Sequence, residues 1–334
     1  MSTTRKIAPA LALAVLAPGI AEVLSGATRL SYLFAYIPEI MVWGCGALLI
    51  RELVLRWRGG WISMLLLGLA LSVAEEFVIQ QTSIAPLPWL GTAPQYGRAW
   101  GVNWIYFLYM LGYESVWVVL VPVQAVYLLF PRLRGETWLR TRGMIISSVL
   151  FLLGSFIAWF SWTQRARTVV FHAAEYKPPV HLIVAGLASI ALLFAAAWSL
   201  RSIRSRTEDA SRTVSNPWLV GIAGFVLGLA WYALIVLVFV PNAPIGAPVV
   251  AACGIAWAAL SFLLIRRWSS GHGWGELQRW ALVFAAILVC MVGGFGGSST
   301  WPRMDLIAKI VLNALAVLGL LALGHRIYRE PRAG

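Results

Sequence analysis

Long apolar stretches separated by short polar segments cover most of this 334-residue chain. Each stretch is long enough for a helix to cross about 30 Å of hydrocarbon. Ten such runs can be drawn, at approximately 7–27, 33–57, 61–81, 103–130, 144–163, 180–200, 217–240, 249–265, 280–298 and 305–327. A spanning helix satisfies its own backbone hydrogen bonds, which lipid cannot do. The pattern therefore predicts an all-α, polytopic transmembrane helical bundle of about ten spans.

The polar segments between the runs predict the orientation of the chain. If the N-terminus is cytoplasmic, most of the 26 Lys and Arg residues fall on the inner side. The outer set is then Arg29, Arg98, Arg165, Arg167, Lys177, Arg303 and Lys309. Short basic loops remain in the cytoplasm during insertion, so we expect both termini inside, in a multi-pass protein of a bacterial inner (plasma) membrane. Arg5 and Lys6 before an apolar stretch also suit a signal peptide, so removal of residues 1–21 stays open.

The composition supports a membrane protein and argues against nucleic-acid binding. The chain is 60% hydrophobic and 12% charged, roughly half the charge of an ordinary soluble domain. Its 18 Trp residues, many of them beside the apolar runs, fit two interfacial belts. The net charge of +13 comes from short Arg-rich loops without interleaved aromatic residues. These loops predict anionic lipids of the inner leaflet as partners rather than nucleic acid.

Glutamates lie inside the first four apolar runs. They are Glu22, Glu39, Glu75, Glu76 and Glu114. A carboxylate in hydrocarbon is costly unless it is paired, protonated or facing water. Counting about 1.5 Å per residue places all five within roughly 7–16 Å of the outer surface. The chain therefore divides into an acid-rich four-span module, residues 1–130, which carries the predicted site, and a six-span scaffold module, residues 131–334.

Prolines near these acids strengthen the prediction of a polar site. Pro18, Pro38 and Pro122 each remove a backbone hydrogen bond and free a carbonyl, which suits a proton, cation or polar substrate. The alternative is that each glutamate is protonated and only bonds a neighbouring helix. Glu52 is different, because it adjoins Arg51 near the inner end of its run. We expect it to form a pair that extends to the membrane interface.

Glu75, Glu76 and Glu114 are the candidate catalytic residues. Adjacent helical residues point about 100° apart, so we expect at most one of Glu75 and Glu76 to aim directly at the site. Crowded carboxyl groups can share a proton, which makes one of them a possible general acid or proton carrier. The candidate substrate- or proton-binding residues are Glu22, Glu39, Gln80 and Arg98.

The outer loop Thr82–Val102 joins the third and fourth runs directly over the acids. It is rich in Pro, Gly and aromatic residues, and both a lid and a plain surface loop fit this composition. Arg98 and Arg29 are expected to pair with a glutamate or to meet an anionic substrate group. His172, Glu175 and His181 are close in sequence, but the prolines between them disfavour a metal site. No metal or cofactor is predicted, since no motif for either is present.

The run Glu75-Glu76-Phe77-Val78-Ile79-Gln80 resembles EExxxR, the first motif of the CAAX-protease and bacteriocin-processing (CPBP) intramembrane family. In that family a second helix carries FxxxH and a third carries HxxxN or HxxxD. Here Gln80 stands where the family has arginine, and Glu114 stands where it has histidine. No later run offers the third motif. The resemblance implies a degenerate or repurposed relative in which Glu75 corresponds to the glutamate that activates water.

Two functions from different classes compete, and a binding or assembly role also remains open. One is a distant CPBP-like intramembrane hydrolase with Glu75 or Glu76 as base and Glu114 as its partner. The other is a proton- or cation-coupled transporter that uses the same acids. A hydrolase requires a water-accessible cavity beside a lateral opening, whereas a transporter requires a path to the cytoplasmic face. Neither pattern identifies the substrate.

Overall fold

The structure, a computed structural model, describes residues 4–90, 95–202, 209–213, 216–240 and 243–329. In this part of the chain, ten helical segments are long and apolar enough to cross a membrane. The strands are short: β1 (Arg98–Ala99) pairs with β2 (Val102–Asn103), and β3 (Asp209–Thr213) pairs with β4 (Gly271–His272). The prediction of an all-α multi-pass bundle is confirmed, and the protein is membrane-embedded.

Each of the first four spans combines α-helix with a π-helical segment, in which one turn holds an extra residue. Span one is α1 (Thr4–Pro18) and the π segment Gly19–Leu24. Span two is a 3-10 turn (Leu30–Ala35), α2 (Tyr36–Glu39), the π segment Ile40–Gly44 and α3 (Cys45–Arg56). Span three is α4 (Trp61–Ala74) and the π segment Glu75–Ile79. Span four is α5 (Trp104–Tyr113), the π segment Glu114–Leu120 and α6 (Val121–Leu129).

The later spans are more regular. Span five is α7 (Thr141–Trp159) and the π segment Phe160–Val170, and span six is α8 (Val180–Ser199). Spans seven to ten are α9 (Pro217–Val238), α10 (Ala247–Ser269), α11 (Glu276–Gly293) and α12 (Arg303–Arg329). Span five continues about seven residues beyond the predicted end, to Val170. It can do so because Arg167 donates to the carbonyls of Ala174 and Pro86 (2.9 and 2.8 Å). These bonds compensate a charged side chain that, by hydropathy alone, would have ended the span.

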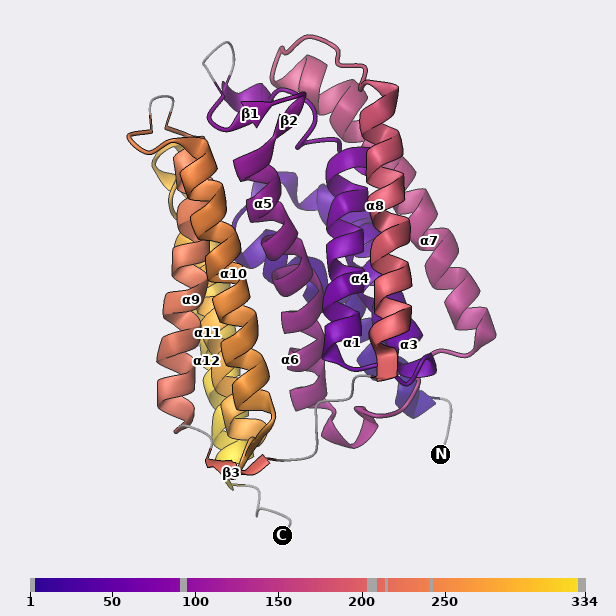
Figure 1. The fold of residues 1–334 in the computed structure, drawn as a ribbon, viewed down its shortest axis with the longest axis vertical. Helices are drawn as coiled ribbons and strands as arrows, with labels where there is room; N and C mark the ends of the chain where they lie inside the picture. Colours follow the sequence, from indigo (N-terminus) through magenta and orange to yellow (C-terminus); the bar gives the residue numbers. More distant parts are fainter. Residues whose placement is uncertain (1–3, 91–94, 203–208, 214–215, 241–242, 330–334) are drawn as a thin grey trace.

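The spans form two groups around a central one (Figure 1). Helices α9 to α12 stand together on the left of the view, and α1, α3, α4, α7 and α8 stand on the right. Span four, with α5 and α6, lies between them and packs against α4 and α1 on one side and α9, α10 and α11 on the other. We call the end that carries β1 and β2 the upper end. The first and last spans meet the opposite, lower end, where α1 begins and α12 finishes.

The pair formed by Arg51 and Glu52 lies inside the protein at the lower end. Both side chains are 0% exposed, so the prediction that they extend to the membrane interface is wrong, although they do pair. The Glu52 carboxylate also accepts hydrogen bonds from the backbone N–H groups of Trp138 and Leu139 (2.8 and 3.3 Å). The Arg51 guanidinium donates to the carbonyls of Leu133, Arg134 and Glu136 (3.4, 3.1 and 2.7 Å). The loop after span four folds back over span two and encloses the pair.

Candidate functional site

The π-helical segments of the first four spans coincide with the intramembrane glutamates. Glu22 lies within its π segment, Glu75 and Glu114 each begin one, and Glu39 immediately precedes one. A π turn leaves a carbonyl without its usual partner and often marks a functional site in a helix. The sequence predicted freed carbonyls from prolines. The structure shows a π segment beside the acid in all four spans.

The acids of spans three and four meet in the protein interior. Glu75 and Glu76 are fully buried, and Glu114 is 3% exposed. The Glu76 carboxyl lies against that of Glu114, which also interacts electrostatically with Glu75. Glu76 therefore contacts Glu114, whereas Glu75 interacts with its neighbours only electrostatically, and the prediction that at most one of the pair aims directly at the site stays a prediction. Span three is surrounded by protein here, so two side chains that leave the helix about 100° apart are both buried.

Span one and span two extend this group. The Glu22 carboxyl interacts electrostatically with Glu75 and Glu114 on one side and with Glu39 on the other. The Thr28 hydroxyl, in the turn between these two spans, donates a hydrogen bond to Glu39. The structure thus brings together all five predicted glutamates, and we call them the acid cluster.

Many carboxyl oxygens of the acid cluster have no hydrogen-bond partner. These buried oxygens are Glu39 Oε2, Glu75 Oε1, Glu75 Oε2, Glu76 Oε1 and Glu114 Oε2. The remaining Glu76 oxygen accepts from the Ser83 hydroxyl at 2.6 Å. Among the described residues, no Lys, Arg or His forms an ion pair with any of the five acids. A buried carboxylate without a cation is much less stable than the neutral acid, so the cluster requires bound protons or a bound cation.

The first part of the loop Thr82–Val102 covers the acid cluster. Residues 81–85 are buried, and Ser83, which bonds Glu76, is fully enclosed. Asn103 fixes this segment, because its side chain donates to the Ala85 carbonyl at 2.9 Å and its N–H donates to the Ser83 carbonyl at 2.8 Å. These residues therefore do not form a plain surface loop, which was one of the two predicted alternatives. The segment 91–94 lies outside the described residues.

The other predicted residues near the site, Arg98, Arg29 and Gln80, make no hydrogen bond to the acids among the described residues. Arg98 donates instead to the carbonyls of Ile84, Ala85 and Gly101 (2.9, 3.1 and 3.3 Å). It therefore holds the covering loop and does not pair with a glutamate, and the alternative that it meets an anionic substrate group stays a prediction. Arg29 lies over the ring of Trp301, 5.5 Å from its centroid. Gln80 is half-buried at the end of span three.

Three buried polar residues of span ten were missed from the sequence. Asp305, Lys309 and Asn313 occur every four residues on one face of α12 and are at most 7% exposed. The Lys309 ammonium donates to the carbonyls of Leu24 and Ser25 (2.7 and 3.0 Å), where the π segment of span one ends. Lys309 is thus inside the protein, and its assignment to an outer loop is wrong. The four-residue spacing in an apolar run was the available signal.

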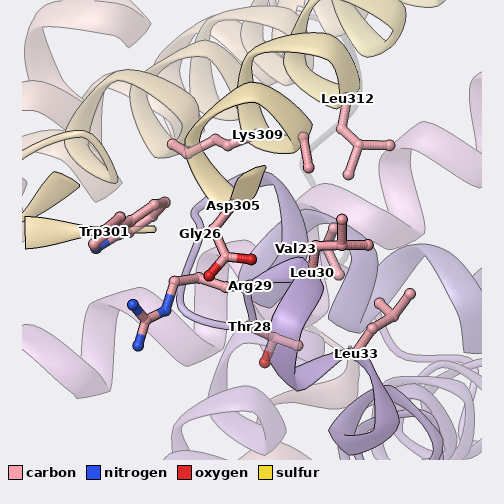
Figure 2. Close-up of a pocket in the computed structure, with 11 residues that line it drawn as sticks. Val23, Gly26, Thr28, Arg29, Leu30, Leu33, Trp301, Asp305, Lys309 and Leu312 are labelled. Atoms are coloured by element: carbon pink, nitrogen blue, oxygen red, sulfur yellow. The ribbon is translucent and has the colours of Figure 1, made fainter. Parts of the chain in front are cut away.

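A small cavity of about 40 Å³ lies beside these residues at the junction of spans one, two and ten. Figure 2 shows Asp305 and Arg29 close together at this junction, with Thr28 from the neighbouring turn. Asp305 accepts from the N–H and hydroxyl of Ser31 (2.9 and 2.8 Å), which ties span ten to the start of span two. The volume suffices for a water molecule. Thr28 connects this junction to the acid cluster through Glu39.

A much larger cavity, of about 910 Å³, lies between spans three and four on one side and α9, α10 and α11 on the other. Its walls are mainly apolar. None of the five acids lines this cavity or the small one. The π segment Glu114–Leu120 nevertheless separates the two regions, because Glu114 faces the acid cluster while Ser115, Val116 and Trp117 line the large cavity.

Comparison of the chain with protein-family models, curated proteins and solved structures finds no match in any of the three. The resemblance to the CPBP family therefore stays a prediction. In the part of the chain that the structure describes, no group of three His, Cys, Asp or Glu side chains has the geometry of a metal site. This includes His172, Glu175 and His181.

Proposed function

We propose that this protein is a proton-coupled transporter of the plasma membrane, with both termini in the cytoplasm and the acid cluster as the proton-carrying site. The observation that carries the proposal is the set of buried carboxyl oxygens without partners or neighbouring cations. Such groups stay in a low-dielectric interior only while they hold protons or a cation. A change in their access to water changes the number of protons they bind, which is the requirement for coupling.

Span four provides the connection to a transported molecule. Its π segment presents Glu114 to the acid cluster and Ser115 to the large cavity. The Ser115 hydroxyl donates to the carbonyls of Leu111 and Gly112 (2.6 and 3.3 Å), within the turn that leads into the π segment. Losing a proton from Glu114 places a charge in this segment, and relieving it requires the segment to move. The wall of the cavity then moves with it.

The CPBP-like hydrolase is the second candidate. It is favoured by the position of Glu75 and Glu76 beside Glu114, since an acid next to a base is what water activation requires. It additionally requires water and a scissile bond to reach Glu75. Neither cavity described above is lined by Glu75, which leaves no described space for a scissile bond beside it, whereas a proton needs much less room than a substrate.

Infrared difference spectroscopy on the purified protein tests the proposal. Protonated carboxyl groups have a C=O stretching band that carboxylates lack. We expect wild type to show such a band, which decreases in Glu75→Gln and in Glu114→Gln and is unchanged in Glu136→Gln, whose carboxyl is partly exposed. In proteoliposomes with an internal pH-sensitive dye, the first two variants should also lose proton movement driven by a pH gradient. Absence of the protonated-carboxyl band from wild type would refute proton coupling. Equal proton movement in wild type and in both variants would also refute it.

A further inference from the structure

We propose that the large cavity binds an anionic phospholipid, whose phosphate is not neutralised by a cationic headgroup, with its acyl chain between span four and α9–α11 and its phosphate at the lower end of the cavity. The proposal does not rest on proton coupling, because it concerns a different face of span four. The ligand's two parts correspond to two regions of the cavity wall: a long apolar region and a short region of hydrogen-bond donors.

The apolar region has the length of an acyl chain. On span four the lining residues extend from Leu108 to Tyr127, about 28 Å at 1.5 Å per residue. Leucines from both sides of the cavity contribute to this wall: Leu65, Leu69, Leu108, Leu120, Leu227 and Leu282. A volume of about 910 Å³ is at the upper end of the range for small-molecule sites. The polar groups of a polar solute would find no hydrogen-bond partners on this apolar wall, whereas a hydrocarbon chain makes van der Waals contacts along it.

The cavity is accessible from the surrounding bilayer. Ile255 lines it from α10 and is 60% exposed, so part of its wall is continuous with the membrane-facing surface. Phe262, about two turns further along the same face of α10, is half-buried and also lines the cavity. A ligand that is already dissolved in the bilayer can therefore enter sideways, without crossing an aqueous phase.

The lower end of the cavity carries the charges that a phosphate needs. Arg134, Arg279 and Gln124 line it there. Arg134 is paired with Glu276 at 2.5 Å. Arg279 interacts electrostatically with the same Glu276 but makes no side-chain hydrogen bond to the described residues, and neither does Gln124. One carboxylate thus lies near two guanidinium groups and pairs with only one of them, which leaves a net positive charge and N–H donors of Arg279 at the cavity. Arginine in this state is well suited to an anionic oxygen.

The test is lipid binding to the full-length protein in detergent, measured by native mass spectrometry. The probes are phosphatidylglycerol and phosphatidylcholine with identical acyl chains. We expect one phosphatidylglycerol to bind about tenfold more tightly than phosphatidylcholine, and Arg279→Gln to remove that difference. Arg303→Gln is the matched control, because Arg303 is exposed at the upper end of the protein. Equal affinity of wild type for the two lipids, or equal losses in the two Arg variants, would overturn the proposal.

The acyl chain is tested separately. Ala259 lines the cavity and is exposed, so Ala259→Trp should fill the space and weaken both lipids by about tenfold or more. If that variant does not elute and melt like wild type, phosphatidylglycerol with six-carbon chains replaces it as the probe and should bind more weakly than the long-chain lipid. Binding that is independent of chain length, or displacement of the lipid by inorganic phosphate alone, would show a plain anion site and contradict the proposal.

Discussion

Replacing Glu52 with Gln removes the negative charge that faces the buried Arg51 guanidinium. Both side chains are inaccessible, so solvent does not screen the remaining cation. Removing one partner of a fully buried ion pair typically costs about 3–5 kcal/mol. Arg51 keeps its backbone carbonyl acceptors and its position 3.4 Å from the centroid of the Trp138 ring, which favours the lower end of that range. We therefore expect a loss of about 3 kcal/mol in the free energy of unfolding.

The matched control is Glu136→Gln. Glu136 pairs with Lys6 at 2.8 Å, but the two side chains are 36% and 31% exposed. An ion pair of this kind contributes about 0–1 kcal/mol. Unfolding by SDS in mixed micelles, followed by tryptophan fluorescence, measures both variants. The double variant Arg51→Met, Glu52→Gln should be more stable than Glu52→Gln alone, because no uncompensated charge remains. Equal stabilities of Glu52→Gln and Glu136→Gln would refute this reasoning.

The remaining predictions concern the acid cluster, a close backbone contact and the topology. Glu75→Gln and Glu114→Gln should melt in detergent like wild type but lose proton movement driven by a pH gradient, since Gln preserves shape and hydrogen bonding and cannot exchange a proton. Wild-type proton movement in both variants would mean that the two acids are only structural. Gly294→Ala should cost roughly 2 kcal/mol or more in an unfolding titration, because its Cβ would lie 1.6 Å from the carbonyl oxygen of Ser25, just after span one, whereas Gly297→Ala, with open space around it, should be neutral. A reporter fused after Gly334 should be active only in the cytoplasm, and activity on the other side would reverse the inferred orientation.

The fold was predictable because lipid leaves few alternatives. An apolar run of this length has to satisfy its backbone internally, so hydropathy alone locates the spans. The convergence of Glu22, Glu75, Glu76 and Glu114 was also accessible, since charges in hydrocarbon have to face protein or water. Composition and depth thus pointed to the side chains that the structure brings together, and their role as a functional site stays a prediction.

Hydropathy contains no information about which loops return to cover which spans. The enclosure of Glu52 depends on the loop after span four, and the role of Arg98 depends on carbonyls that face inward only in the folded loop. The π segments beside the acids were likewise not specified by any residue pattern. Lys309 was misplaced because a lysine near a span's end was assumed to be in water rather than bonded to carbonyls of span one.

The contacts of span ten with the end of span one and the start of span two also determine when this junction can form during biosynthesis. The bond from Lys309 to the Leu24 carbonyl joins residues 285 positions apart, and that from Ser31 to Asp305 joins residues 274 positions apart. At roughly 5–20 residues per second, the ribosome needs about 15–60 s to reach span ten after span one has emerged. During that interval the end of span one has inserted without the ammonium group that later binds its carbonyls. The junction of spans one, two and ten is therefore completed only after the last span has been inserted, and a ribosome that stalls before span ten leaves it open.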